Sequence, residues 1–187
     1  MFSKYRLPGQ LENEQVIKIV RKDIFVLLKK IFLFALLIIL PYAFYYITKE
    51  SIFPTILEGQ VSYPVLILIS SFYFLFIWLF FFFSFIDYYL DIWVITDERI
   101  IDIRQEGFFS RTISEQRLFR VQDVTSETQG FFRTVFKYGD VHIQTAATKQ
   151  RFFFDDVSHP EGIRDLIIKQ IERSKIKHKD EIEKEEK

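Results

Sequence analysis

The longest apolar stretch of the chain covers residues 65–86, which read VLILISSFYFLFIWLFFFFSFI without a charge. As an α-helix this stretch would reach about 33 Å, against a bilayer hydrocarbon core of roughly 30 Å. A helix satisfies its backbone polar groups internally, as lipid requires, whereas the core helices of soluble proteins keep a polar face and are usually shorter. The pattern predicts a transmembrane helix over about residues 65–89.

A second apolar stretch lies upstream. It begins with IFVLL at residues 24–28 and continues beyond Lys29 and Lys30 as IFLFALLIILPYAFYYI. The two lysine stems can lie along apolar surface while their ammonium groups reach the headgroups. Three tyrosines near the other end fit an interfacial aromatic belt. We expect a helix over about residues 24–47. Together with the helix predicted at residues 65–89, it would form a transmembrane hairpin over residues 24–91.

Flanking charge predicts the orientation of this hairpin. Residues 1–30 hold seven lysines and arginines against three acidic residues, while the connecting loop holds one lysine and two glutamates. The positive-inside rule places the N-terminus in the cytoplasm, and a second crossing returns the C-terminal part there. The apolar stretch begins late and no small-residue cleavage pattern follows it, so no cleaved signal peptide is expected. The chain has no cysteine, which suits a cytosolic domain. We expect a two-pass protein of the cell (inner, cytoplasmic) membrane.

Beyond residue 91 the pattern changes to short β-branched runs separated by turn residues. We expect strands at residues 92–96, 100–105, 112–113, 118–124, 135–136, 141–145 and 150–154. Residues 137–140 read as a tight turn, with Gly139 placed for a positive φ. Many short strands followed by one helix indicate a small α+β domain, a β-barrel or sandwich with a helical cap.

The final helix has a clear predicted start. Ser158 and Glu161 match the S-x-x-E capping box, with Pro160 tolerated in the first turn. An apolar stripe at helical spacing follows: Ile163, Leu166, Ile167 and Ile171. The chain thus divides into a cytoplasmic segment (1–23), the hairpin (24–91), the domain (92–174) and a charged tail (175–187) expected to be a frayed helix or disordered.

The residues that could carry chemistry form no catalytic pattern. None of the three histidines, His142, His159 and His178, has a partner at the spacing of H-E-x-x-H, and no P-loop, G-x-G-x-x-G or G-x-S-x-G occurs. Basic and acidic residues number 25 each and are interspersed, which does not favour nucleic-acid binding. We expect no enzyme activity, no cofactor and no metal.

Two acidic pairs have simpler interpretations than catalysis. Asp87 and Asp91 lie one helical turn apart at the headgroup boundary, where solvated end charges are the simpler interpretation. Asp155 and Asp156 are adjacent, so on a strand they would point to opposite faces. We interpret them as charges near the positive end of the final helix.

Several short motifs carry a family resemblance. They are Leu7-Pro8-Gly9, Glu14-Gln15-Val16, Val20-Arg21-Lys22, Trp93-Val94-Ile95-Thr96-Asp97-Glu98-Arg99-Ile100-Ile101, Gly107-Phe108-Phe109-Ser110-Arg111, Val121-Gln122-Asp123-Val124, Tyr138-Gly139-Asp140-Val141 and the positions Phe154, Val157 and Pro160. In this order they resemble a family of bacterial pleckstrin-homology-like membrane proteins, long catalogued as a domain of unknown function. The resemblance implies a seven-stranded bent antiparallel sheet or barrel, capped by one C-terminal helix.

The resemblance implies a binding module, but a fold does not specify its ligand. Phosphoinositide sites in the similar eukaryotic modules use a basic cluster around the first strands. Acidic residues dilute the charge in that region of this chain, so we expect no specific phosphoinositide pocket. General attraction to anionic lipid remains open at about 1 kcal/mol per nearby cation. The candidate lipid or partner contacts are Arg99, Arg104, Arg117 and Arg120.

We therefore expect a non-enzymatic scaffold at the cytoplasmic membrane surface, where tethering raises the effective concentration of the domain for a protein partner or its own copies. Its expected partners are membrane lipids and such a protein, not nucleic acid. One alternative is an anionic-lipid-sensing module that uses the candidate arginines. Another is a small oligomeric transport or channel subunit, with a pore lined by Ser70, Ser71 and Ser84.

Overall fold

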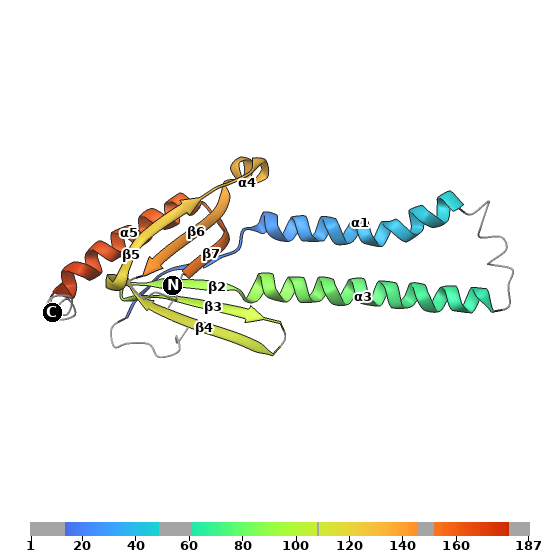
Figure 1. Ribbon diagram of the computed structural model, residues 1–187, viewed down its shortest axis with the longest axis horizontal. Coiled ribbons are helices and arrows are strands. Elements are labelled where there is room, and N and C mark those ends of the chain that lie inside the picture. The colour runs from blue at the N-terminus through green and yellow to red at the C-terminus, as the bar shows by residue number, and fades with distance from the viewer. Residues whose placement is uncertain (1–13, 49–60, 108, 146–151, 180–187) are drawn as a thin grey trace. The chain divides into compact units, whose positions relative to one another are not determined.

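The protein is represented by a computed structural model that describes residues 14–48, 61–107, 109–145 and 152–179. The chain forms two compact units. One is Ile24–Tyr88, and the other combines Met1–Asp23 with Tyr89–Lys187. The first unit is a pair of helices, and the second, called the domain below, consists of strands and shorter helices (Figure 1).

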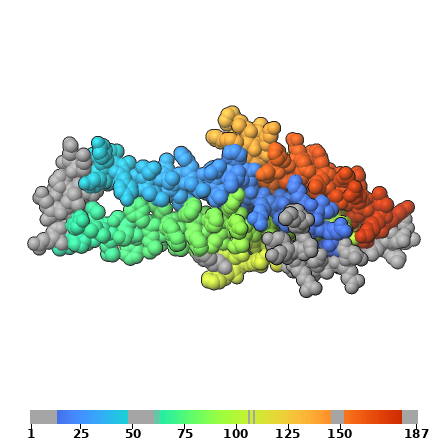
Figure 2. Space-filling view, turned by 180° about the vertical axis from the view of Figure 1, so that it is seen from behind, coloured from blue at the N-terminus to red at the C-terminus, as the bar shows by residue number. Residues whose placement is uncertain are grey.

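Two long apolar helices make up the first unit, α1 (Ile24–Thr48) and α3 (Ser62–Leu90). Their bounds lie within a few residues of the predicted helices. Within this unit they run side by side (Figure 2), and the Tyr73 hydroxyl donates to the Leu37 carbonyl at 2.8 Å. Both helices are long and apolar enough to cross a membrane. The structure therefore confirms the two apolar helices.

Seven described strands form two antiparallel sheets that do not close into a barrel. The four-stranded sheet has the order β1 (Val16–Arg21), β2 (Ile92–Thr96), β3 (Arg99–Glu106) and β4 (Ser110–Arg117). The three-stranded sheet has the order β5 (Val121–Glu127), β6 (Tyr138–Thr145) and β7 (Phe152–Ser158). A single bridge between Lys22 and Val157 connects the edges of the two sheets.

Strand β1 precedes the helical pair in the chain but pairs with β2, which follows that pair. Val20 lies opposite Trp93, and Arg21 lies opposite Ile92. The VIKIVR sequence of β1 is rich in β-branched residues, which suit a pleated surface. Whereas the sequence pattern suggests a separate segment over residues 1–23, the structure makes residues 16–21 an integral strand of the domain.

The core of the domain combines both sheets with the final helix, α5 (Pro160–Lys177). Trp93 and Phe154 are fully buried and stack with their ring centroids 5.1 Å apart. Helix α5 buries the predicted apolar stripe, Ile163, Ile167 and Ile171, with Leu166 partly buried beside it. These contacts confirm that one C-terminal helix packs on the strands.

Two predicted strands have a different form in the structure. The stretch predicted as a strand at residues 118–124 begins with a 3-10 turn, η1 (Leu118–Arg120), and only then enters β5. The short strand predicted at residues 135–136 is instead the end of a helix, α4 (Phe131–Phe136). Alternation of side chains in so few residues cannot separate a strand from a single helical turn.

The turn after α4 also differs from the predicted one. Lys137 adopts the left-handed conformation with φ 55°, while Gly139, predicted to have a positive φ, lies within β6. Glycine is required there by space. A Cβ on Gly139 would lie 2.4 Å from the backbone oxygen of Glu127 on the neighbouring strand.

The start of α5 lacks the predicted capping box. His159, with φ 51°, is the N-cap and makes no side-chain capping hydrogen bond. The Ser158 hydroxyl donates instead to the carboxylate of Asp23, because β7 places it beside the end of β1. The predicted role of Ser158 is therefore wrong.

Helix α5 continues to Lys177, so the predicted charged tail begins inside the helix. Its residues 180–187 lie outside the described residues. The same holds for the motif at residues 7–9 and for residues 150–151 of the last predicted strand.

Candidate functional site

Arg99, the first of the four candidate arginines, is a structural residue at the start of β3. Its side chain bonds both carboxylate oxygens of Glu14, at 2.9 Å and 3.0 Å, and also pairs with Glu115. The hydrogen bond to Glu14 raises the pKa of Arg99 despite burial. Only 6% of Arg99 is exposed, so the guanidinium is committed to contacts inside the domain.

Arg104 connects the two sheets. From β3 it donates to the Phe153 carbonyl of β7 at 2.6 Å and pairs with Asp102 at 2.9 Å. Burial raises the pKa of Asp102, although the adjacent Arg104 opposes that shift. Arg104 therefore satisfies a backbone carbonyl and a buried carboxylate.

Arg117 and Arg120 are exposed and flank one aromatic ring. Their guanidinium carbons lie 5.8 Å and 5.7 Å from the ring centroid of Phe119, which stacks on His178 of the α5 end at 5.3 Å. Cation–π contacts of this kind hold the arginines over the ring but leave their charges near solvent. Of the four candidate arginines, Arg117 and Arg120 lie next to each other on the surface of the domain, beside the same ring. Their contact with a lipid or partner stays a prediction.

A buried ion network lies at the opposite end of β2 and β3. Lys22, which follows β1, places its ammonium nitrogen 2.8 Å from Asp91 and 2.9 Å from Asp155. Asp91 also accepts a hydrogen bond from the Gln105 backbone at 2.9 Å. Burial lowers the pKa of Lys22, but the hydrogen bonds to the two carboxylates outweigh it and raise that pKa overall.

This network corrects the interpretation of the acidic residues. Asp91 is 7% exposed and ion-paired, so it is not a solvated end charge. Asp155 and Asp156 lie in β7 rather than at the start of α5. Their side chains reach different cations, Lys22 and Arg133, as expected for neighbours on a strand.

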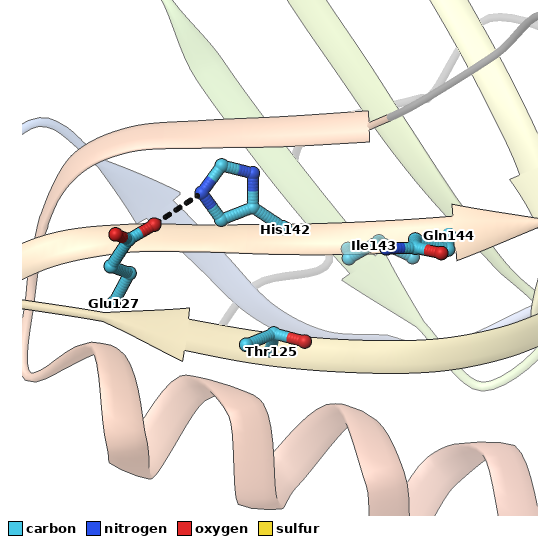
Figure 3. Close-up of a pocket in the computed structure, with 5 residues that line it drawn as sticks. All are labelled: Thr125, Glu127, His142, Ile143 and Gln144. Carbon is cyan, nitrogen blue, oxygen red and sulfur yellow. Dashed lines mark ion pairs between the residues drawn. The ribbon is translucent and has the colours of Figure 1, made fainter.

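A shallow hollow of about 260 Å³ lies on the open face of the three-stranded sheet. Thr125 and Glu127 of β5 line it with His142, Ile143 and Gln144 of β6. Figure 3 shows His142 and Glu127 pointing toward each other, with Nε2 and Oε2 3.3 Å apart. Pockets for small molecules usually span about 300–1,000 Å³ and are mostly apolar. This hollow is smaller than that range.

No group of three or more metal-ligating side chains occurs in the described ranges.

The helical unit has a larger, mostly apolar hollow of about 640 Å³ between α1 and α3. Ser70 and Tyr73 line it, but their hydroxyls donate to the backbone carbonyls of Ile67 and Leu37. Ser71 likewise bonds Ile67. The hydroxyls of two of the serines considered as pore-lining residues thus bond backbone carbonyls of their own helix.

Sequence reasoning missed the contacts that span the chain. Glu14 lies 85 positions from Arg99, and Lys22 lies 69 positions from Asp91. Nothing in the local pattern joins such residues. The β-branched run of β1 was the available signal, because a strand before the helices needs a partner after them.

Comparison with known proteins gives one family match. A family model described as "Bacterial PH domain" matches residues 23–171, well over half of the chain. A crystal structure of a DUF1696 family protein with a pleckstrin-homology domain, from Shewanella loihica PV-4, is similar at 18% identity. The similarity covers 43% of this chain and 70% of that chain, with a TM-score of 0.36, which is too low to support an argument. No curated protein matches the chain.

Proposed function

This chain belongs to the bacterial PH domain family, and we propose that it is a non-enzymatic binding or scaffold protein anchored in the cell membrane by two transmembrane helices. The observation that carries the proposal is the pairing of β1 with β2. One strand precedes the helical pair and the other follows it, so a pair that spans the bilayer must return the chain to the side it left.

The side chains of α1 and α3 support the anchoring. Phe32, Ile39 and Trp78 are 71%, 62% and 62% exposed, as are many other large apolar side chains of both helices. A core helix of a soluble protein would bury such groups. Helices of 25 and 29 residues reach about 37 Å and 43 Å, enough for the roughly 30 Å of hydrocarbon with some tilt. The excess of cations before α1 favours a cytoplasmic domain.

The domain surface favours a protein partner, or a second copy, over a soluble metabolite. The hollow at His142 and Glu127 is shallow and small, while β4 forms a polar outer edge of its sheet. Edge strands and shallow mixed hollows suit recognition of a polypeptide.

Anionic-lipid sensing is the second candidate, and the exposed pair Arg117 and Arg120 favours it. The position of these two arginines in the domain weakens the case for lipid sensing. Arg117 lies opposite Arg99 at the end of β3 that is remote from Asp91, whereas Asp91 directly follows α3. The pair thus lies at the end of the sheet away from the chain connections to the helices.

Native mass measurement of the full-length protein in mild detergent tests the proposal. A defined oligomer, or one protein bound in fixed stoichiometry, supports the scaffold role. A monomer that retains only anionic lipid contradicts it. In that case, R117Q/R120Q should reduce lipid retention and its steep salt dependence, whereas R173Q/K175Q, which removes the same charge from α5, should not.

A further inference from the structure

Helix α4 carries an unusual concentration of exposed apolar side chains for a soluble surface. Phe131, Phe132 and Val135 are 77%, 67% and 54% exposed, and Phe136 is 40% exposed. None of the six residues of α4 is buried. Figure 2 shows the helix as a knob that stands out from the domain. Single exposed apolar residues are ordinary, but a contiguous group marks an interaction surface.

The charged residue of α4 fixes this orientation. Arg133 directs its guanidinium into the domain, where it pairs with Asp140 and Asp156 at 2.7 Å each. The helix is thereby held by its one cation while its aromatic side chains face outward. The ion pairs of Arg133 thus hold α4 against the domain while its apolar side chains remain exposed.

Helix α4 lies beside the point where the chain leaves the domain for α1. The backbone oxygen of Asp156 accepts a hydrogen bond from the backbone nitrogen of Asp23 at 2.7 Å, and α1 begins at the next residue, Ile24. Asp156 is also the partner of Arg133. Two contacts therefore connect α4 to Asp23, the last residue of the domain before α1 in the chain.

A further exposed aromatic residue lies beside the other connection, the one from α3 to β2. Phe109, in the turn between β3 and β4, is fully exposed. This turn follows Gln105, whose backbone nitrogen bonds Asp91, the residue directly after α3. Figure 1 shows α4 and the β3–β4 turn at the same end of the domain as the end of β1 and the start of β2.

We propose that Phe109, Phe131, Phe132, Val135 and Phe136 form an aromatic docking surface that inserts into the headgroup and upper acyl region of the bilayer. The inference rests on the proposed function, because the two connections hold this end of the domain at the membrane only if α1 and α3 span it. Aromatic and aliphatic side chains bury about 5–10 Å into that region. The bilayer thus covers apolar surface that would otherwise face water, and fixes the orientation of the domain.

Depth measurement by spin labelling of the full-length protein in vesicles tests this surface. The chain has no cysteine, so each variant carries one nitroxide. Phe131→Cys and Val135→Cys report the docking surface. Ile176→Cys is the matched control, because it is 79% exposed next to Lys177, which pairs with Glu98 at the opposite end of the sheet. Leu75→Cys, 59% exposed in α3, reports the helices.

The measured quantity is the collision rate of each label with oxygen relative to a water-soluble nickel chelate, a ratio that rises in lipid. We expect a several-fold higher ratio at residues 131 and 135 than at residue 176, together with a high ratio at residue 75. A high ratio at residue 75 with equal, low ratios at residues 131 and 176 would overturn the docking surface and leave the membrane anchor intact. A low ratio at residue 75 would reject the anchor and the docking surface together. Dipolar broadening between labels at residue 131, without lipid contact, would assign the surface to a second copy and overturn the proposal.

Discussion

The ammonium nitrogen of Lys22 lies 2.8 Å from the carboxylate of Asp91. Lys22 stands two positions before α1, and Asp91 directly follows α3. The chain segments that lead to and from the two apolar helices are therefore ion-paired within the domain. Both side chains are mostly buried, with 13% and 10% exposed.

Lys22→Met should destabilise the domain, because it leaves the buried carboxylate of Asp91 and the partly exposed carboxylate of Asp155 without their cation. Breaking a buried ion pair costs ~3–5 kcal/mol, and we expect a loss near the lower end of that range. The measurement is urea unfolding in detergent, monitored through the fluorescence of Trp93 in a Trp78→Phe background. Lys177→Met removes the exposed pair with Glu98 and should leave the midpoint unchanged. Equal effects of the two substitutions would contradict the structural role of Lys22.

The pH dependence of this pair follows from the raised pKa of Lys22. A raised folded-state pKa gives stability that is fully present below the ordinary value of 10.5 and is lost as the pH rises through the folded value. The difference between the wild type and Lys22→Met should thus stay constant from about pH 7 to about pH 10 and shrink only above that range. A difference that disappears near neutrality would contradict the pairing.

Asp102→Asn should stabilise the domain at neutral pH. Burial raises the pKa of Asp102 above its usual value of 3.8, so ionisation of this carboxyl opposes folding above that pH. An amide removes the cost and keeps an acceptor for Arg104. Unfolding midpoints of both proteins at about pH 7 and about pH 4 provide the comparison. We expect a gain at pH 7 that shrinks at pH 4, and a loss at pH 7 would show that the ion pair with Arg104 outweighs burial.

Substitution of two glycines by alanine should have opposite effects. At Gly139 the added Cβ meets the Glu127 oxygen at 2.4 Å, and overpacking of this kind costs roughly 1–3 kcal/mol. At Gly162, in the first turn of α5, a Cβ meets nothing within 4 Å, and the gain in helix propensity is smaller than the roughly 1 kcal/mol of a helix interior. Thermal unfolding of both variants measures the difference. Tolerance of alanine at residue 139 would contradict the close approach of β5 and β6.

The two tryptophans should report different surroundings in vesicles. Trp78 is 62% exposed on α3, whereas Trp93 is fully buried in the core of the domain. If α3 lies in the bilayer, brominated acyl chains will quench Trp78 on contact and leave Trp93 bright. The Trp93→Phe protein should therefore lose most of its emission in brominated vesicles, and the Trp78→Phe protein should not. Equal quenching of both would argue against a lipid-exposed α3.

The sequence was sufficient to predict an element where its apolar pattern is long or periodic. The uncharged run at residues 65–86 predicted α3, and the stripe Ile163, Ile167 and Ile171 predicted the buried face of α5. It was insufficient where the chain is short or the partner is distant. Helix α4 has only six residues, and none of them is buried.

The candidate arginines show the same limit. The sequence alone does not distinguish Arg99 from Arg117. In the structure Arg99 forms a buried ion pair with Glu14, whereas Arg117 is exposed. Glu14 and Arg99 meet because β1 pairs with β2. These two strands are separated in the sequence by both apolar helices. Residue type therefore identified the candidates, and only tertiary structure separated them.

Labelling of single cysteines by a membrane-impermeant maleimide tests the central claim, a two-helix anchor with the domain in the cytoplasm. Val61→Cys, 75% exposed just before α3, and Ile176→Cys on α5 each give one thiol in a chain that otherwise has none. In right-side-out membrane vesicles we predict labelling of residue 61 and protection of residue 176, with the reverse in inside-out vesicles. Labelling of both residues from the same side would contradict the anchor.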